Sequence, residues 1–123
     1  MNESKKILVI EDDPDIRMLL NVRLKAAGYA AVFAFDAVTA ISTARKENPD
    51  LIILDLGLPG GGYVVMERLR ALATLSLTPI VVISAQDAKV HTERAGAAGA
   101  YAFLEKPIDS DRLLAALAEA LND

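Results

Sequence analysis

The sequence has no cysteine, no tryptophan and only one histidine among its 123 residues. The lack of cysteine excludes a disulfide scaffold and any zinc or iron–sulfur site that needs thiolate ligands. A lone imidazole cannot build a histidine-rich metal site, and we interpret His91 as a solvated surface residue. Aromatic residues contribute 5% of the chain and hydrophobic residues 53%, so Ala, Val, Ile and Leu dominate the apolar content. This mixture favours helices packed on a buried parallel sheet.

Long hydrophobic runs and basic clusters are also absent. The uncharged, mostly apolar stretch over residues 26–35 is far too short to span a membrane. The apolar run that ends before Glu11 is too short for a signal peptide. The 13 basic residues are scattered and the net charge is −4, so the chain lacks the footprint of a nucleic-acid binder. We therefore expect a cytoplasmic protein that binds neither nucleic acid nor a membrane.

The chain length of 123 residues is typical of one compact domain that folds without a metal or a disulfide. No linker, internal repeat or low-complexity segment interrupts it. We expect a single domain over residues 1–123, with a core over about 5–122 and no output domain.

Short runs of branched apolar residues recur along the chain and predict strands. Three of them are apolar on both faces, as central strands of a parallel sheet are. The runs at 101–104 and 31–35 contain fewer branched apolar residues, so they predict strands less strongly. The predicted strands cover residues 7–10, 31–35, 51–54, 80–83 and 101–104.

Helical periodicity fills the segments between and after these strands. Asp13 followed by Pro14 opens the first helix and Gly28 closes it. Asp36 is placed to cap the second helix. A third helix is expected around 65–72, a fourth over 87–98 and a last one that ends near residue 121. Val90 is the only large aliphatic residue in 87–98, so we expect that helix to be among the more mobile elements.

Five strand–helix units with right-handed crossovers predict a doubly wound α/β fold, with a five-stranded parallel sheet between two helical layers. Ligands of such folds bind beyond the carboxyl ends of the strands. Polar residues gather at those ends. They are Glu11, Asp12 and Asp13 after the first strand, Asp55 after the third, Ser84 and Ala85 after the fourth, and Lys106 before Pro107 after the fifth.

This ordered set resembles the receiver domain of two-component response regulators, across essentially the whole chain. The acidic pair is Glu11 and Asp12, and the family's phosphoacceptor matches Asp55 within Asp-Leu-Gly-Leu-Pro. The switch hydroxyl matches Ser84, and Lys106 precedes the family's proline. The resemblance implies a flavodoxin-like strand order 2-1-3-4-5. That order places the first and third strands side by side, so Asp12 and Asp55 would converge.

Clustered carboxylates repel one another, and a hard divalent cation relieves that repulsion through oxygen ligands. The resemblance implies Mg²⁺ or Mn²⁺ as the cofactor. Asp12 and Asp55 would bind it directly, Glu11 would bind it through water, and the backbone carbonyl of Gly57 would complete the protein's share. A carboxylate can also attack a phosphoryl group, which would make Asp55 an aspartyl phosphate.

The resemblance further implies a switch around the phosphoryl group. Lys106 would pair with Asp55 before transfer and with a phosphate oxygen afterwards, and Ser84 with its neighbour Ala85 would bind the phosphate. The peptide before Pro107 is cis in the family. Phe103 stands where many relatives have Tyr, and its movement would change a surface made by the fourth helix, fifth strand and fifth helix.

The implied partners are a histidine kinase or a histidine phosphotransfer protein as donor, and a downstream protein that binds the switching surface. A homodimer through the last helices is common among relatives. Such a protein is a signalling switch rather than an enzyme. A stand-alone regulator, a phosphorelay shuttle and a domain of a longer protein all remain open.

Two positions are predicted to set the lifetime of the phosphoryl group by controlling water access. Gly57 leaves one side open and Gln86 screens the other. Strand alternation also predicts that Tyr101 shares the face of Phe103.

The chain departs from the family pattern after Pro59. Residues 60–62 are all glycine, so the loop is one residue short and lacks an Asp. We interpret it as a flexible connection. This departure keeps a constitutive, phosphorylation-independent interaction module open as an alternative. A phosphatase with an aspartyl nucleophile is a further alternative, but its second Asp would fall at Gly57.

Overall fold

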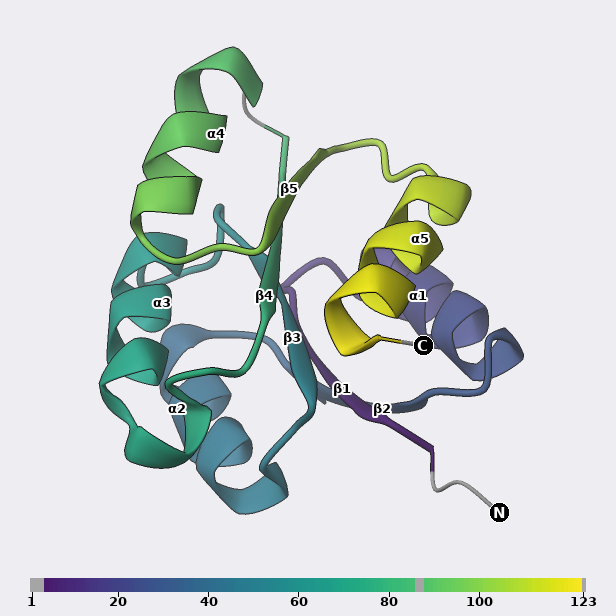
Figure 1. Ribbon diagram of the computed structural model, residues 1–123, viewed down its shortest axis with the longest axis horizontal. Coiled ribbons are helices and arrows are strands. Elements are labelled where there is room, and N and C mark those ends of the chain that lie inside the picture. Colours follow the sequence, from purple (N-terminus) through teal and green to yellow (C-terminus); the bar gives the residue numbers. More distant parts are fainter. Residues whose placement is uncertain (1–3, 86–87, 123) are drawn as a thin grey trace.

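A computed structural model describes residues 4–85 and 88–122 of the chain. One parallel sheet runs through the molecule in the order β2-β1-β3-β4-β5, as the resemblance implied (Figure 1). Its strands are β1 (Lys6–Ile10), β2 (Ala30–Ala34), β3 (Leu51–Asp55), β4 (Ile80–Ser84) and β5 (Ala102–Glu105). The helices are α1 (Pro14–Ala26), α2 (Ala37–Glu47), α3 (Gly62–Ala71), α4 (Ala88–Ala97) and α5 (Ser110–Leu121), with a short 3₁₀ turn at Ala73–Leu75.

Side chains alternate between the two faces of the sheet and divide the core into two hydrophobic clusters, one on each face. Leu8 and Ile10 of β1 face the cluster shared with α2 and α3, whereas Ile7 and Val9 face the cluster shared with α1 and α5. All four are fully buried. In Figure 1, α2, α3 and α4 lie on one side of the sheet and α1 and α5 on the other. The three-layer arrangement predicted from the sequence is therefore confirmed.

The helix ends follow their capping residues. The side chain of Asp13 accepts a hydrogen bond from the backbone N–H of Asp15 at the start of α1. Asp36 forms a reciprocal capping box with Thr39 at the start of α2. Gly28 follows α1 with φ +91°, a conformation that glycine adopts without strain. These local signals place α1 and α2 where the sequence predicts them.

The fifth strand begins one residue later than predicted, so Tyr101 directly precedes it. Partial burial and the nearby Glu119 of α5 raise the pKa of the Tyr101 phenol, and Phe103 packs against the core cluster shared with α2 and α3. The backbone N–H of Tyr101 donates to the carbonyl of Ile80, in step with the β4–β5 ladder, and the shared face of Tyr101 and Phe103 stays a prediction.

The helix α4 packs lightly where its side chains are described. Among residues 93–97 only Ala95 is buried. Its mobility stays a prediction, and Gln86 lies outside the described residues. Within residues 4–85 and 88–122, no helix is long and apolar enough to cross a membrane.

Candidate functional site

The register of the sheet brings the polar strand ends together. Ile10 of β1 pairs with Leu54 of β3, so Glu11 and Asp55 come one position later on neighbouring strands. Asp55 in turn pairs with Ile83 of β4, one residue before Ser84. The carboxyl edge of the three central strands therefore carries one continuous polar cluster.

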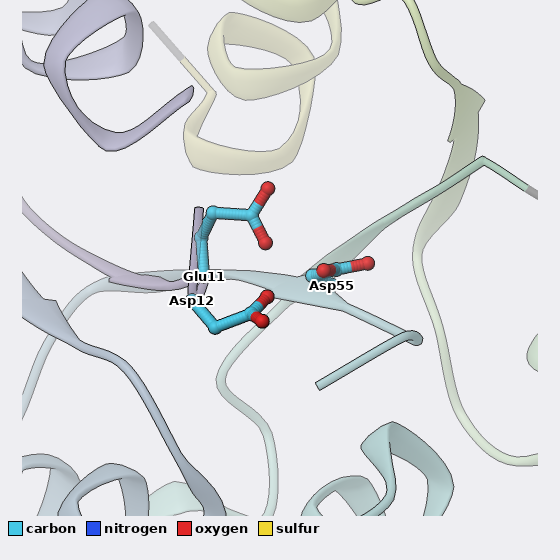
Figure 2. Close-up of side chains that lie close together, drawn as sticks. All are labelled: Glu11, Asp12 and Asp55. Carbon is cyan, nitrogen blue, oxygen red and sulfur yellow. The ribbon is translucent and has the colours of Figure 1, made fainter. Parts of the chain in front are cut away.

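Three carboxylates meet at this edge, as Figure 2 shows. One oxygen each of Glu11, Asp12 and Asp55 lies within 4.8 Å of the others. Glu11 is completely buried, Asp55 is 4% exposed and Asp12 is open to solvent. The cluster is thus anchored in the core and accessible at one corner.

The ammonium group of Lys106 lies between two of these acids. Its Nζ is 2.8 Å from Oε1 of Glu11 and 3.3 Å from Oδ2 of Asp55. The backbone N–H of Lys106 donates to the carbonyl of Ser84, which ties the end of β5 to β4. The peptide between Lys106 and Pro107 is cis, as the resemblance implied. The shorter contact to Glu11 was not foreseen.

The buried acids differ in their affinity for protons. Burial, reinforced by the neighbouring Asp55, raises the pKa of Glu11 to about 8. Burial alone would raise the pKa of Asp55. Hydrogen bonds from Glu11 and from the Gly57 N–H, together with the charge of Lys106, outweigh burial, and the pKa of Asp55 is lowered. Although burial opposes it, contact with Glu11 and Asp55 raises the pKa of Lys106. Asp55 is therefore the more acidic of the two buried carboxyls.

The donor set fits a hard divalent cation. Oε2 of Glu11 is buried and has no hydrogen-bond partner in the described structure, although buried polar atoms are normally paired. Three carboxylates also face a single ammonium group. Oxygen ligands of this kind suit Mg²⁺ or Mn²⁺. A cation here would offset both the unpaired oxygen and the excess negative charge.

Gly57 has no side chain, so the space next to it beside the Asp55 carboxylate is open. Its backbone N–H donates to Oδ1 of Asp55 at 2.9 Å. A Cβ at Gly57 would lie 3.5 Å from the same oxygen, an ordinary contact distance. A larger residue would therefore fit and would place its side chain beside the carboxylate of Asp55.

The glycine loop after Pro59 is sterically determined, so the flexible connection expected from the sequence needs correction. Gly60 has φ +95° and a Cβ there would lie 2.7 Å from Cβ of Ala37. Gly61 has φ +93° and donates its N–H to the carbonyl of Leu58. A Cβ at Gly62 would lie 2.5 Å from Cα of Leu56. Each glycine therefore has a conformational or packing reason, and α3 begins directly at Gly62.

The remaining predicted residues surround this cluster at different depths. Ser84 is 1% exposed at the end of β4, and Ala85 after it is exposed. Phe103 is half-buried in β5.

Sequence reasoning missed Arg17, whose guanidinium contacts the backbone of the acidic loop. The available signal was its position in the first turns of α1, since helical side chains point back toward the N-terminus.

The comparisons agree with this architecture. The sequence model of the response regulator receiver domain matches residues 7–118. The transcriptional regulatory protein KdpE of Mycobacterium tuberculosis is 36% identical over 116 residues, covering 94% of this chain and 50% of the relative. The chemotaxis response regulator CheY4 of Vibrio cholerae superposes with a TM-score of 0.89 at 28% identity, covering 96% of this chain and 99% of that one.

A third similar structure is the receiver domain of the sensor histidine kinase PA1611 from Pseudomonas aeruginosa, which carries a magnesium ion in its active-site cleft. It has a TM-score of 0.89 at 26% identity, covering 98% of this chain and 99% of that one. The chain belongs to the response regulator receiver family of two-component signalling. It spans about half the length of the curated relatives that it matches.

Proposed function

We propose that the chain is a phosphorylation-controlled receiver that accepts a phosphoryl group on Asp55. The observation that carries this proposal is the meeting of three carboxylates within 4.8 Å, with the Lys106 ammonium 3.3 Å from Asp55. Asp55 is the acid with the lowered pKa, so it is ionised and nucleophilic near neutral pH. Residues 1–123 would act as one receiver unit.

The transfer step forms one bond and breaks one. An Oδ atom of Asp55 attacks the phosphorus of a phosphohistidine on a kinase or phosphotransfer protein. The P–O bond forms as the P–N bond breaks, and the imidazole leaves with the bonding electrons and takes up a proton. Glu11, Asp12, Asp55 and the Gly57 carbonyl would hold Mg²⁺ or Mn²⁺. The bound cation would neutralise charge on the phosphoryl oxygens.

The new phosphoryl charge would then bias a second arrangement of the edge. Lys106 is already within reach of Asp55 and would pair with a phosphate oxygen. Ser84 and the backbone at Ala85 would bind the other oxygens. Movement of Ser84 would make room for Phe103, and the surface of α4, β5 and α5 would change its affinity for a downstream protein. Homodimerisation through this face stays a prediction.

An exposed apolar patch beside the site supports a protein as donor. Met18, Leu19 and Val22 of α1 are 70%, 40% and 56% exposed, and α1 begins directly after the acidic loop. We expect the double variant Met18→Lys and Val22→Lys to slow transfer from a phosphorylated phosphotransfer protein at least tenfold. Transfer from a small acyl phosphate should be unchanged, since that donor needs no docking surface.

The experiment that tests the proposal is intact-mass measurement after incubation with Mg²⁺ and a small acyl phosphate. We expect a gain of one phosphoryl group that is lost with a chelator and in Asp55→Asn. No gain from that donor or from a phosphohistidine protein would overturn the proposal. Downstream binding that Asp55→Asn leaves unchanged would instead favour the constitutive module.

A further inference from the structure

The guanidinium of Arg17 holds the loop that carries the acidic pair. Its Nη1 donates to the backbone carbonyl of Glu11 at 3.0 Å and to that of Asp12 at 3.0 Å. Arg17 lies one turn into α1, and its backbone N–H also donates to the carbonyl of Asp13. A single residue therefore bonds to the main chain of three consecutive positions.

An aromatic ring supports this guanidinium from the neighbouring loop. The Cζ atom of Arg17 lies 5.8 Å from the centroid of the Phe35 ring, a cation–π geometry. Phe35 follows β2 and is 53% exposed, so its ring is free to lie against the guanidinium at the surface. Its backbone N–H is bonded to the side-chain oxygen of Thr39. The backbone that carries the ring is therefore tied to the first turn of α2.

We infer that Arg17, supported by Phe35, is a positioning residue for divalent-cation binding by Glu11 and Asp12. This inference rests on the proposed function of the site. The two carbonyl bonds orient the peptide planes on either side of the exposed Asp12, so that its carboxylate faces Asp55. Without them the loop would gain conformations in which the three oxygens do not converge, and binding would have to select the competent one.

The electrostatic effect of Arg17 has the opposite sign and makes the inference testable. A guanidinium beside the acidic cluster repels a second cation. If charge were its only contribution, removal of Arg17 would tighten cation binding. If it positions the loop, its removal weakens binding, because residues that orient metal ligands typically contribute 10–100-fold to affinity.

Calorimetric titration of the unphosphorylated protein with Mg²⁺ distinguishes these effects. We expect Arg17→Met to raise the Mg²⁺ dissociation constant about tenfold. Phe35→Ala should raise it roughly threefold, and Phe35→Tyr, which keeps the ring, should restore it. Arg23→Met is the matched control, because it removes an exposed charge from the same helix without touching the loop.

Thermal melts would first confirm that each variant is folded. Unchanged or tighter Mg²⁺ binding in folded Arg17→Met, or equal weakening in Arg23→Met, would overturn the inference while leaving the proposed function intact. If Arg17→Met does not fold, Phe35→Ala compared with Phe35→Tyr decides alone. A wild-type protein that binds no Mg²⁺ would instead overturn the proposed function, and the inference with it.

Discussion

The two loops that form the acidic edge are held in opposite ways. The β1–α1 loop carries Glu11 and Asp12 and is held by bonds from the side chain of Arg17. The β3–α3 loop is held by the absence of side chains, since Gly60 and Gly62 allow backbone to approach where a Cβ would clash. One loop is fixed by added hydrogen bonds and the other by close packing.

This difference predicts how each loop responds to mutation. Loss of a solvent-accessible hydrogen bond is partly replaced by water, so the β1–α1 loop should lose order while the fold survives. A clash with backbone has no such replacement, so the β3–α3 loop should fail through global stability.

Gly62→Ala should cause the largest loss of stability. The new Cβ would lie 2.5 Å from Cα of Leu56 and 2.9 Å from the carbonyl oxygen of Asp55. We expect the free energy of unfolding to fall by about 3 kcal/mol, measured by urea denaturation. The control is Gly96→Ala in α4, where nothing lies within 4 Å of the new Cβ and alanine favours the helix. Equal effects of both substitutions would contradict the close-packing account.

Glu11→Gln should stabilise the metal-free protein at high pH. The folded pKa of Glu11 is raised from 4.5 to about 8, so folding retains a proton that the unfolded chain loses. The contribution of the Glu11 carboxyl to the free energy of unfolding is therefore fully present below pH 4.5 and is lost as the pH rises toward 8. We expect the variant to be more stable than wild type by about 2 kcal/mol at pH 8 and nearly equal at pH 4.5.

The measurement is urea denaturation with a chelator present at both pH values. Asp55, whose pKa is lowered, loses its own stabilising contribution as the pH falls. Because its pKa lies below 3.8, Asp55 is ionised at both pH values, and its contribution changes little between the two measurements. A difference that does not grow with pH would contradict the raised pKa of Glu11.

Gly60→Ala should destabilise by about 1–2 kcal/mol, because φ +95° is strained for alanine and its Cβ would meet Ala37. Adding Ala37→Gly removes the steric contact but leaves the backbone strain. We therefore expect the double variant to recover part of the loss, measured as a double-mutant cycle. Full recovery of the free energy of unfolding would show that backbone strain at position 60 contributes nothing. No recovery would show that the contact with Ala37 contributes nothing.

Gly57→Asn should have the smallest effect on stability and a kinetic effect instead. The new Cβ would lie at an ordinary contact distance, so we expect the free energy of unfolding to change by less than about 0.5 kcal/mol. The added side chain would stand beside Asp55 and alter the approach of water. A several-fold change in the half-life of the phosphoryl group, followed by timed intact-mass measurement, is the expected result. An unchanged half-life would leave Gly57 without a role in lifetime.

The parts of this fold that sequence reasoning predicted depend on local chemistry. Asp13 and Asp36 cap their helices because a carboxylate two or three residues before an N–H can reach it. The strands are apolar on both faces because helices cover both sides of the sheet. The order of the strands has no local signal of this kind, and only the family resemblance implied it.

The prediction that needed correction involves contacts between distant segments. The glycines after Pro59 look flexible in sequence, but the positions of Ala37 and Leu56 explain two of them.

Residue types and their spacing were thus enough to indicate the parallel α/β architecture and the acidic strand ends, since both arise from periodicity and capping within about ten residues. Tertiary structure alone decided that Lys106 bonds more closely to Glu11 than to Asp55. It also decided that the Arg17 side chain donates hydrogen bonds to the backbone of the acidic loop. Lys106 and Glu11 are 95 residues apart in the chain. Their distance depends on how the four strands β1, β3, β4 and β5 are registered, and no local pattern contains that information.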